Sequence, residues 1–319
     1  MQTTPIRIGT RESELAVWQA TAVQHLLQER GLVVQLVYIK SDGDIDLKTP
    51  LYEMGVQGIF TRSLDSALLN GSIDIAVHSM KDVPTQLPKG IMQCAVLERA
   101  SYKDIVVLNS QWSMVNHQLE ANQNSLAAIH HLPITIATSS IRRKAQWLHR
   151  YPNHNIENLR GNVNTRLKKV AESNWSGAIF AGAGLERINL RPTNSIDLDW
   201  MLPAPAQGAI MVVCREGDNR CFDACQLFHH AETALCTQLE RDFLRALMGG
   251  CSTPISALAQ IKNNMVHFRG SIVAVDGSAK AEIEKTVSIL EAADLGYLAA
   301  KDILEQGGQA IVDTINHAN

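Results

Sequence analysis

Residues 134–181 read ITIATSSIRRKAQWLHRYPNHNIENLRGNVNTRLKKVAESNWSGAIFA, and their pattern decides the fold. Three short apolar runs predict strands at residues 134–137, 156–159 and 178–181. Ser139 can cap a helix that runs to about Arg150, and residues 163–172 have the spacing of a second helix. Because strands that alternate with helices pair through crossover connections, this stretch predicts a mostly parallel α/β sheet.

The same alternation extends from the N-terminus to about residue 214, and a different pattern follows it. Further strands are predicted at residues 6–8, 32–39, 73–77, 105–108 and 210–214, and helices at 10–29 and 60–70. Residues 109–131 predict only a loop and one short helix. Near the C-terminus, helices are predicted at 231–248 and 292–306, and strands at 265–275 and 279–289. The last two strands flank Asp276-Gly277, a strong hairpin signal, so the chain ends in a small α+β domain.

Composition and charge limit the class of protein. The 319 residues are 45% hydrophobic and carry a net charge of -3, as expected for a soluble protein of two or three domains. No window approaches the roughly 18 apolar residues of a membrane span, and residues 1–9 lack the features of a signal peptide. We therefore expect a cytoplasmic protein that does not bind membranes.

The six cysteines do not suggest a metal site. None forms a C-x-x-C pair, and in the cytosol most should be reduced, buried and apolar in character. Cys221 and Cys225 lie four residues apart, with His229 and His230 close behind, but a zinc site would need a second cysteine pair. No metal is predicted.

Positive charge is concentrated between Ile141 and Val170. This stretch has one acidic residue, Glu157, and eight basic ones: Arg142, Arg143, Lys144, Arg150, Arg160, Arg166, Lys168 and Lys169. Arginine presents a planar fork of donors that binds carboxylate or phosphate groups. The stretch therefore indicates a ligand with several anionic groups, although a solvated helix face would also explain it.

Four short runs contain residues that can do chemistry: HSMKDVP at 78–84, TSSIRR at 138–143, LRGNVNTR at 159–166 and GGCSTP at 249–254. In the first, Lys81 and Asp82 place an anion contact beside a proton carrier after a strand. The second and third combine helix-start hydroxyl and N–H groups with arginines. In the fourth, Cys251 lies on a predicted loop, where a thiol can be a nucleophile or an attachment point. A polar loop, capped helices and a packed cysteine are the ordinary structural explanations.

Together these runs resemble the hydroxymethylbilane synthases, also called porphobilinogen deaminases. The resemblance covers nearly the whole chain, with motifs at residues 8–13, 15–19, 58–60, 77–84, 138–143, 159–166, 206–209 and 249–254. It implies two domains like those of type II periplasmic binding proteins around a cleft, plus a smaller α+β domain. The implied boundaries are 1–99 with 204–226, then 100–203, then 227–319.

The resemblance also implies an activity. Enzymes of this family join four porphobilinogen molecules head to tail, release ammonia at each step and hydrolyse the product to hydroxymethylbilane. The chain grows on a dipyrromethane cofactor bound by a thioether to the loop cysteine, here Cys251. Each pyrrole carries an acetate and a propionate, which accounts for clustered arginines in an acidic protein. The expected protein is a monomer that binds porphobilinogen and oligopyrroles, and no nucleic acid.

By the same resemblance, Asp82 is the catalytic group, because a carboxylate near the pyrrole N–H stabilises positive charge as ammonia leaves. The implied cofactor-binding residues are Cys251, Lys81, Ser79, Arg142, Arg143, Ser139, Thr138 and Asp82. The implied substrate-binding residues are Arg11, Ser13, Phe60, Arg160, Arg166 and Gln207.

The chain departs from the family pattern at four places. Glu12-Ser13-Glu14 stands where Lys, Ser and Pro are frequent, Gln57 where Lys is frequent, and Ala206 where Gly is common. Residues 109–131 also form a longer stretch than usual. These departures affect the expected rate and loop behaviour and not the expected reaction.

Two other functions fit parts of the pattern. A non-catalytic, two-lobed anion-binding protein would need neither Cys251 nor Asp82 beside Lys81. A nucleic-acid binder would need a more basic domain and more stacking residues than Trp147 and Tyr151 supply.

Overall fold

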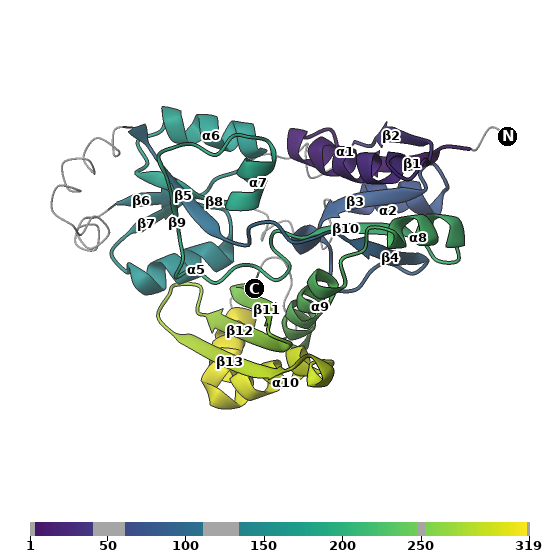
Figure 1. The fold of residues 1–319 in the computed structure, drawn as a ribbon. Coiled ribbons are helices and arrows are strands. Elements are labelled where there is room, and N and C mark those ends of the chain that lie inside the picture. The colour runs from purple at the N-terminus through teal and green to yellow at the C-terminus, as the bar shows by residue number, and fades with distance from the viewer. Residues whose placement is uncertain (1–3, 41–60, 111–133, 248–252, 318–319) are drawn as a thin grey trace.

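The protein is built on three β-sheets. The computed structural model describes residues 4–40, 61–110, 134–247 and 253–317. Two five-stranded mixed sheets with flanking helices lie side by side, and a three-stranded antiparallel sheet lies below them (Figure 1). The prediction of two α/β domains with a smaller α+β C-terminal domain is confirmed, while the exact boundaries stay a prediction.

The first sheet has the strand order β2-β1-β3-β10-β4. Its strands are β1 (Ile6–Thr10), β2 (Val34–Tyr38), β3 (Ile75–Ser79), β4 (Ile91–Val96) and β10 (Ile210–Arg215). The first three run parallel, whereas β10 is antiparallel to both of its neighbours. Helices α1 (Glu14–Gln28) and α8 (Asn219–Gln226) pack on one face, and α2 (Arg62–Leu69) packs on the other. Because β1 and β3 are parallel, Arg11 and Lys81 follow their strands at the same edge of the sheet.

The second sheet has the order β7-β6-β8-β5-β9. Its strands are β5 (Asp104–Leu108), β6 (Thr135–Ala137), β7 (Asn155–Glu157), β8 (Gly177–Ala181) and β9 (Ser195–Asp197). Helix α5 (Ile141–Arg150) packs on one face through Trp147, with Tyr151 directly after it. Helices α6 (Val163–Glu172) and α7 (Gly182–Arg187) lie on the other face, where Val170 and Leu185 join the core.

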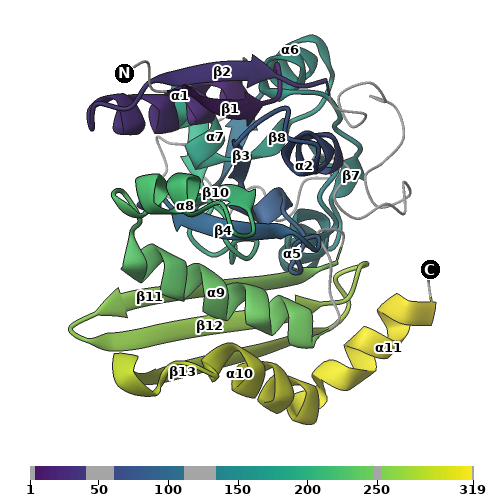
Figure 2. The same cartoon turned by 90° about the vertical axis from the view of Figure 1, so that its right-hand side faces the viewer.

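The third sheet is an antiparallel meander of β11 (Ile255–Lys262), β12 (Met265–Val273) and β13 (Lys280–Ser288). The predicted turn at Asp276-Gly277 joins the last two strands, with Gly277 at a φ of 80°. Helices α9 (Ala231–Ala246) and α10 (Leu295–Ile303) cover one face of the sheet, as Figure 2 shows, and α11 (Gln309–His317) follows them. The rings of Phe243 and Phe268 meet in this core with centroids 5.3 Å apart.

Two chain segments, residues 97–103 and 198–209, cross between the first two domains, and the third domain is fastened to both. Glu240 on α9 is fully buried and accepts hydrogen bonds from Arg99 Nη1 at 2.6 Å and from the backbone N–H of Ala206 at 2.6 Å. It also accepts one from the backbone N–H of Ala259 on β11 at 2.8 Å. Because a buried carboxylate is costly unless it is fully paired, this group fixes the crossing segments against the third domain.

Replacing Ala206 by Gly is expected to stabilise the protein by about 1 kcal/mol. Ala206 has a φ of 61°, a left-handed conformation that strains a residue with a Cβ atom and that Gly adopts freely. The greater freedom of Gly in the unfolded chain offsets part of the gain. A higher midpoint of urea-induced unfolding would bear this out. Ala204→Gly is the matched control and should lower the midpoint, and a lowered midpoint in Ala206→Gly would contradict the prediction.

Several elements differ from the sequence-based expectation. The helix predicted from residue 10 begins at Glu14, because Thr10 still pairs with Tyr38 in the sheet. The sheets are mixed and not mostly parallel, since β4, β5, β9 and β10 take part in antiparallel pairs. Six of the described α-helices and β-strands were not predicted: β4, β9, β11, α7, α8 and α11. Within the residues that the structure describes, none of the helices has the length and hydropathy that a membrane crossing requires.

Candidate active site

A buried carboxylate that the sequence analysis did not single out organises the junction between the first two domains. Asp104 opens β5 and is fully buried. Its Oδ1 accepts hydrogen bonds from Arg143 Nε at 3.0 Å and Nη2 at 2.8 Å, and its Oδ2 lies 2.7 Å from Arg142 Nη2. Burial alone would raise the pKa of Asp104, but the charges of the two arginines and of other neighbours lower it to about 2.

Gln207 connects this carboxylate to Lys81. The Gln207 side chain is buried, and its Nε2 donates to Asp104 Oδ1 at 3.0 Å and to the Tyr102 carbonyl at 2.8 Å. Its Oε1 accepts from Lys81 Nζ at 3.3 Å. Burial lowers the pKa of Lys81 to about 8, with Asp82 opposing that change. The predicted site residues Lys81, Gln207, Arg142 and Arg143 are therefore brought together from both domains.

Asp82 directly follows Lys81 in the short 3-10 helix η2 (Met80–Asp82), and its surroundings contrast with those of Asp104. Its side chain is half-buried, and within the described ranges its carboxylate has neither a hydrogen bond nor an ion pair. It is near enough to Lys81 and to Arg166 on α6 that its charge opposes the lowering of the pKa of both by burial. Asp82 is thus a carboxylate near two cations that holds no part of the fold by hydrogen bond or ion pair among the described residues.

Arg166 supplies positive charge from the opposite domain. Burial, together with the charges of Arg143 and Arg160, lowers the pKa of Arg166 to about 10. Its Nε is buried and has no hydrogen-bond partner among the residues that the structure places. Arg160 is also buried, in the loop between β7 and α6. Several guanidinium groups held close together in a buried region, one with an unused donor, indicate a place for an anionic ligand.

The predicted hydroxyl residues mostly have structural partners. Ser79 Oγ and the Gln19 amide are hydrogen-bonded at 2.9 Å. Ser139 Oγ donates to the Leu159 carbonyl and accepts from the Leu159 N–H, so it joins two loops and does not cap α5. The residue that caps α5 is Ser140, and the prediction of a Ser139 cap is wrong because Leu159 already occupies that hydroxyl.

The remaining predicted residues lie at the edge of this cluster or outside the described part of the chain. Thr138 Oγ1 accepts from the Ser140 N–H at 3.2 Å, and Ser13 precedes α1 without a side-chain capping bond. Burial lowers the pKa of His78 to about 3, and the charge of nearby Arg11 adds to that effect. Phe60 and Cys251 lie outside the described residues.

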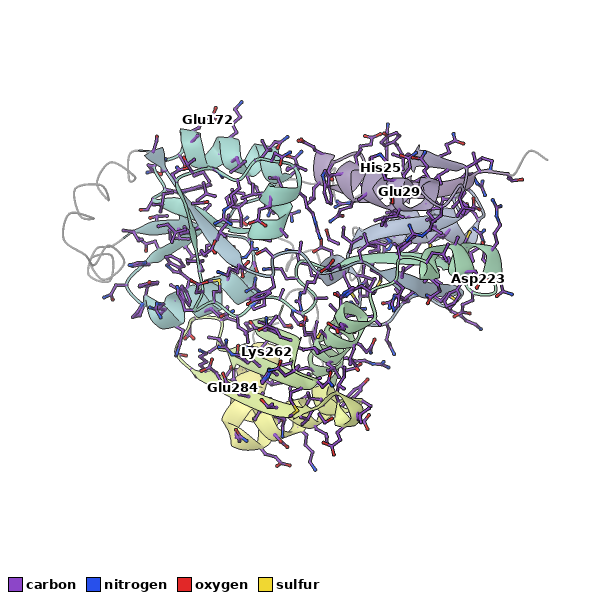
Figure 3. The ribbon with its side chains drawn as sticks, viewed as in Figure 1. His25, Glu29, Glu172, Asp223, Lys262 and Glu284 are labelled. Atoms are coloured by element: carbon purple, nitrogen blue, oxygen red, sulfur yellow. The ribbon has the colours of Figure 1, made fainter. Side chains whose placement is uncertain are left out.

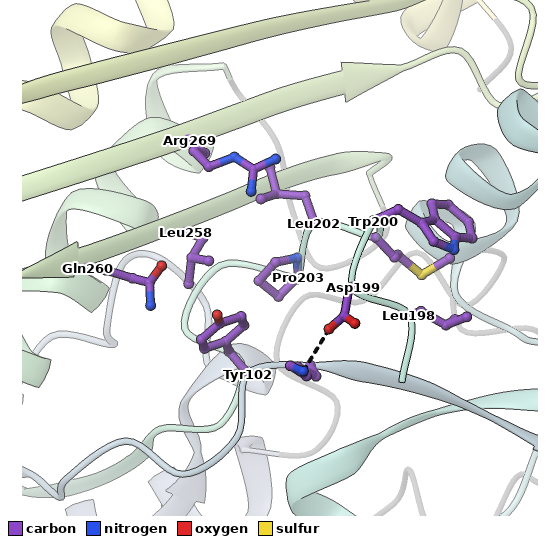
Figure 4. Close-up of a pocket in the computed structure, with 11 residues that line it drawn as sticks. Tyr102, Leu198, Asp199, Trp200, Leu202, Pro203, Leu258, Gln260 and Arg269 are labelled. Atoms are coloured by element: carbon purple, nitrogen blue, oxygen red, sulfur yellow. Dashed lines mark ion pairs between the residues drawn. The ribbon is translucent and has the colours of Figure 1, made fainter. Parts of the chain in front are cut away.

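A small pocket lies apart from this cluster (Figure 4). Tyr102 and Trp200 from the crossing segments line it together with Leu258 and Arg269 of the third sheet. The ion pair of Lys103 Nζ with Asp199 Oδ1, at 2.6 Å, lies on its wall. None of the predicted site residues line this pocket, so the candidate site is the cluster around Lys81, Asp82 and Arg166.

Two family models match successive parts of the chain. Residues 6–223 match the porphobilinogen deaminase, dipyromethane cofactor binding domain, and residues 234–305 match the porphobilinogen deaminase, C-terminal domain. The chain belongs to the porphobilinogen deaminase family. The predicted family, the transferase class, the place in tetrapyrrole biosynthesis and the dipyrromethane type of cofactor are confirmed by these matches and by the relatives below.

Full-length relatives support the same assignment. The porphobilinogen deaminase of Syntrophotalea carbinolica is 38% identical, with 99% of this chain and 98% of the relative aligned. The chloroplastic porphobilinogen deaminase of Pisum sativum is also 38% identical, with 99% of this chain and 83% of the relative aligned. The family assignment therefore extends over all three domains.

Solved structures with a related arrangement are more distant. The methionine binding protein MetQ aligns with 70% of this chain and 87% of its own, at 15% identity and a TM-score of 0.42. The BvgS VFT2 domain of Bordetella pertussis aligns with 70% and 85%, at 13% identity and a TM-score of 0.39.

Proposed function

We propose that this porphobilinogen deaminase joins four porphobilinogen molecules head to tail, releases ammonia at each step and hydrolyses the product to hydroxymethylbilane. The observation that carries the proposal is the position of Asp82 near Lys81 and Arg166, where its carboxylate has no hydrogen bond or ion pair within the described residues. We further propose that the enzyme is a cytoplasmic monomer with domains at residues 1–99 with 204–226, 100–203 and 227–319.

The basic side chains of the cluster bind the substrate carboxylates. Arg166 has a buried donor without a partner among the described residues, and Arg160 lies close to it. Arg11 lies near His78 in the first domain. Arg143 is committed more fully, because its three nitrogens already donate to Asp104 and to the Ile179 carbonyl. We therefore assign the first contact with incoming acetate and propionate groups to Arg166 and Arg160. The positive charges of Arg142 and Arg143 attract these anionic groups to the site, and both residues provide the remaining contacts with the cofactor.

Asp82 acts on the charge that develops during the reaction. As ammonia leaves the substrate, positive charge builds up on the pyrrole, and a half-buried carboxylate close to the ring nitrogen stabilises it. The same carboxylate can accept the pyrrole proton and return it in the next step. Lys81 lies beside Asp82 and binds an anionic group there. Gln207 orients Lys81 by accepting its hydrogen bond.

The donor set of the cluster fits a dipyrromethane, whose ring substituents are carboxylates. When bound, this group supplies the anchor on which the pyrrole chain is extended. Arg166 Nε, which has no partner among the described residues, and the cationic Lys81 are suited to its acetates and propionates. We propose Cys251 as the thioether position, and Ser79, Thr138 and Ser139 as additional polar contacts.

Intact mass spectrometry tests the attachment. The purified protein is expected to carry an excess mass equal to two linked pyrrole units, and Cys251→Ser should remove all of it. Cys236→Ser is the matched control, because Cys236 is buried against the third sheet and should leave the excess in place. An excess mass retained in Cys251→Ser would refute the assignment of the attachment site. Absence of any porphobilinogen turnover in the loaded protein would refute the proposed function itself.

A further inference from the structure

The first two domains touch at two places that differ greatly in character. On one side the crossing segments are tied together by buried hydrogen bonds between the two domains, because Gln207 Nε2 donates to the charged Asp104 Oδ1 at 3.0 Å and to the Tyr102 carbonyl at 2.8 Å. On the other side, α1 of the first domain meets α6 and α7 of the second at the surface, far from the third domain (Figures 1 and 2). Because buried charged contacts are costly to separate and exposed ones are not, the domains would part first on the second side.

Three contacts make up this exposed junction, which we call the rim contact. Asn164 Nδ2 on α6 donates to Glu14 Oε2 on α1 at 2.8 Å. The guanidinium carbon of Arg187 on α7 lies 5.7 Å from the centre of the Trp18 ring. Leu15 Cδ2 would lie 3.6 Å from a Cβ atom built on Gly184, so α1 and α7 approach within van der Waals range.

The charges of the rim contact favour closure. Glu14 is the first residue of α1 and Asn164 is the second residue of α6, so the N-terminal turns of both helices meet there. Each helix N-terminus carries partial positive charge, which the carboxylate of Glu14 offsets on both sides of the junction. Arg187 is fixed independently, because its Nη2 donates to the Gly208 carbonyl at 2.7 Å. Its cation therefore stays available to the face of Trp18.

The rim contact is also weak enough to be released. Glu14 and Asn164 are exposed, and Trp18 is 39% exposed. An exposed polar contact of this kind changes an equilibrium by about two- to fivefold, in contrast to a buried ion pair. Glu14 is one of the positions at which this chain departs from the resemblance noted above, where proline is frequent, and a proline could not make this bond.

We propose that Glu14 and Trp18 of α1, with Asn164 and Arg187, form a releasable latch that holds the first two domains closed at their outer edge while the buried junction serves as the hinge. The latch would open to make room when a growing product fills the space between the domains. Only that last consequence rests on the proposed function. The latch itself exists in the protein without substrate.

Single-molecule Förster resonance energy transfer between dyes at Glu29 and Glu172 measures how far apart the outer edges of the two domains are. Both side chains are exposed, near the outer ends of α1 and α6, and both are labelled in Figure 3. Dyes can be attached there through a ketone-bearing non-natural residue, which leaves the native cysteines untouched. We expect one dominant high-transfer population in the parent protein. Glu14→Ala and Trp18→Ala should each increase the low-transfer population about two- to fivefold.

Three further variants distinguish the hydrogen bond between Glu14 and Asn164 from a general effect of surface charge on domain opening. Asn164→Asp should open the domains further than Glu14→Ala, because two carboxylates then face each other. Glu14→Gln should open them less than Glu14→Ala, because its amide oxygen can still accept the hydrogen bond although the charge is lost. Glu12→Ala is the matched control, since Glu12 is exposed and has no hydrogen bond or ion pair within the described residues. Unchanged transfer in Glu14→Ala and Asn164→Asp would overturn the latch. An equal shift in Glu12→Ala and Glu14→Ala would overturn it as well. No substrate is present, so neither result bears on the proposed function.

Discussion

Replacing Asp82 by Asn is expected to lower the turnover of porphobilinogen by at least about 100-fold while the protein stays folded. The amide has nearly the same shape but cannot neutralise positive charge on the pyrrole or carry its proton. The fold should not suffer, because the Asp82 carboxylate makes no hydrogen bond or ion pair in the described part of the chain. Steady-state ammonia release and product formation, measured on protein that carries its cofactor, would test this.

Two further variants sharpen the test of Asp82. Asp223→Asn makes the same chemical change on the exposed surface of α8 and should leave turnover at the parent value. Asp82→Glu keeps the charge and displaces it by one methylene, so it should retain more activity than Asp82→Asn. Turnover of Asp82→Asn within about threefold of the parent would rule out the role given to Asp82, provided that its cofactor mass is normal.

The sequence motifs located much of the candidate site because they lie where strands end. Lys81 and Asp82 follow β3, and Arg160 and Arg166 flank the start of α6. In an α/β sheet these positions face the region where ligands bind, so residue type and position gave consistent information. The strands with continuous apolar runs, such as β5 and β10, were predicted nearly to the residue.

Asp104 could not be recognised in the same way. It is a single acidic residue between Lys103 and the apolar run of β5, and nothing local distinguishes it from a surface residue. Its importance comes from partners distant in the sequence, namely Arg143 at 39 positions and Gln207 at 103 positions away. The one available signal was an acidic residue placed directly before a fully apolar strand. The strand β4 was missed because Gln93 interrupts its apolar run.

Asp104→Asn is expected to destabilise the protein by roughly 3 kcal/mol, the largest effect on stability that we predict. The variant leaves Arg142 and Arg143 buried without their counter-ion, although the amide oxygen can keep one hydrogen bond. Urea-induced unfolding at pH 7 measures the loss. Asp197→Asn is the matched control on the neighbouring strand β9, where a partly exposed carboxylate pairs with Lys103 and Arg191. That variant should lose less than about 1 kcal/mol.

The pH dependence of the stability difference shows whether Asp104→Asn acts through the lost charge or through altered packing. The folded-state pKa of Asp104, about 2, lies below the ordinary aspartate value of 3.8, so ionised Asp104 stabilises the folded protein above about pH 4. This contribution is lost as the pH falls through the folded-state pKa, since the carboxyl is then protonated in both states. The stability difference between the parent and Asp104→Asn should therefore be full at pH 7 and smaller at pH 3. A difference that stays constant over this range would mean that packing, and not the charge of Asp104, holds the two arginines in place.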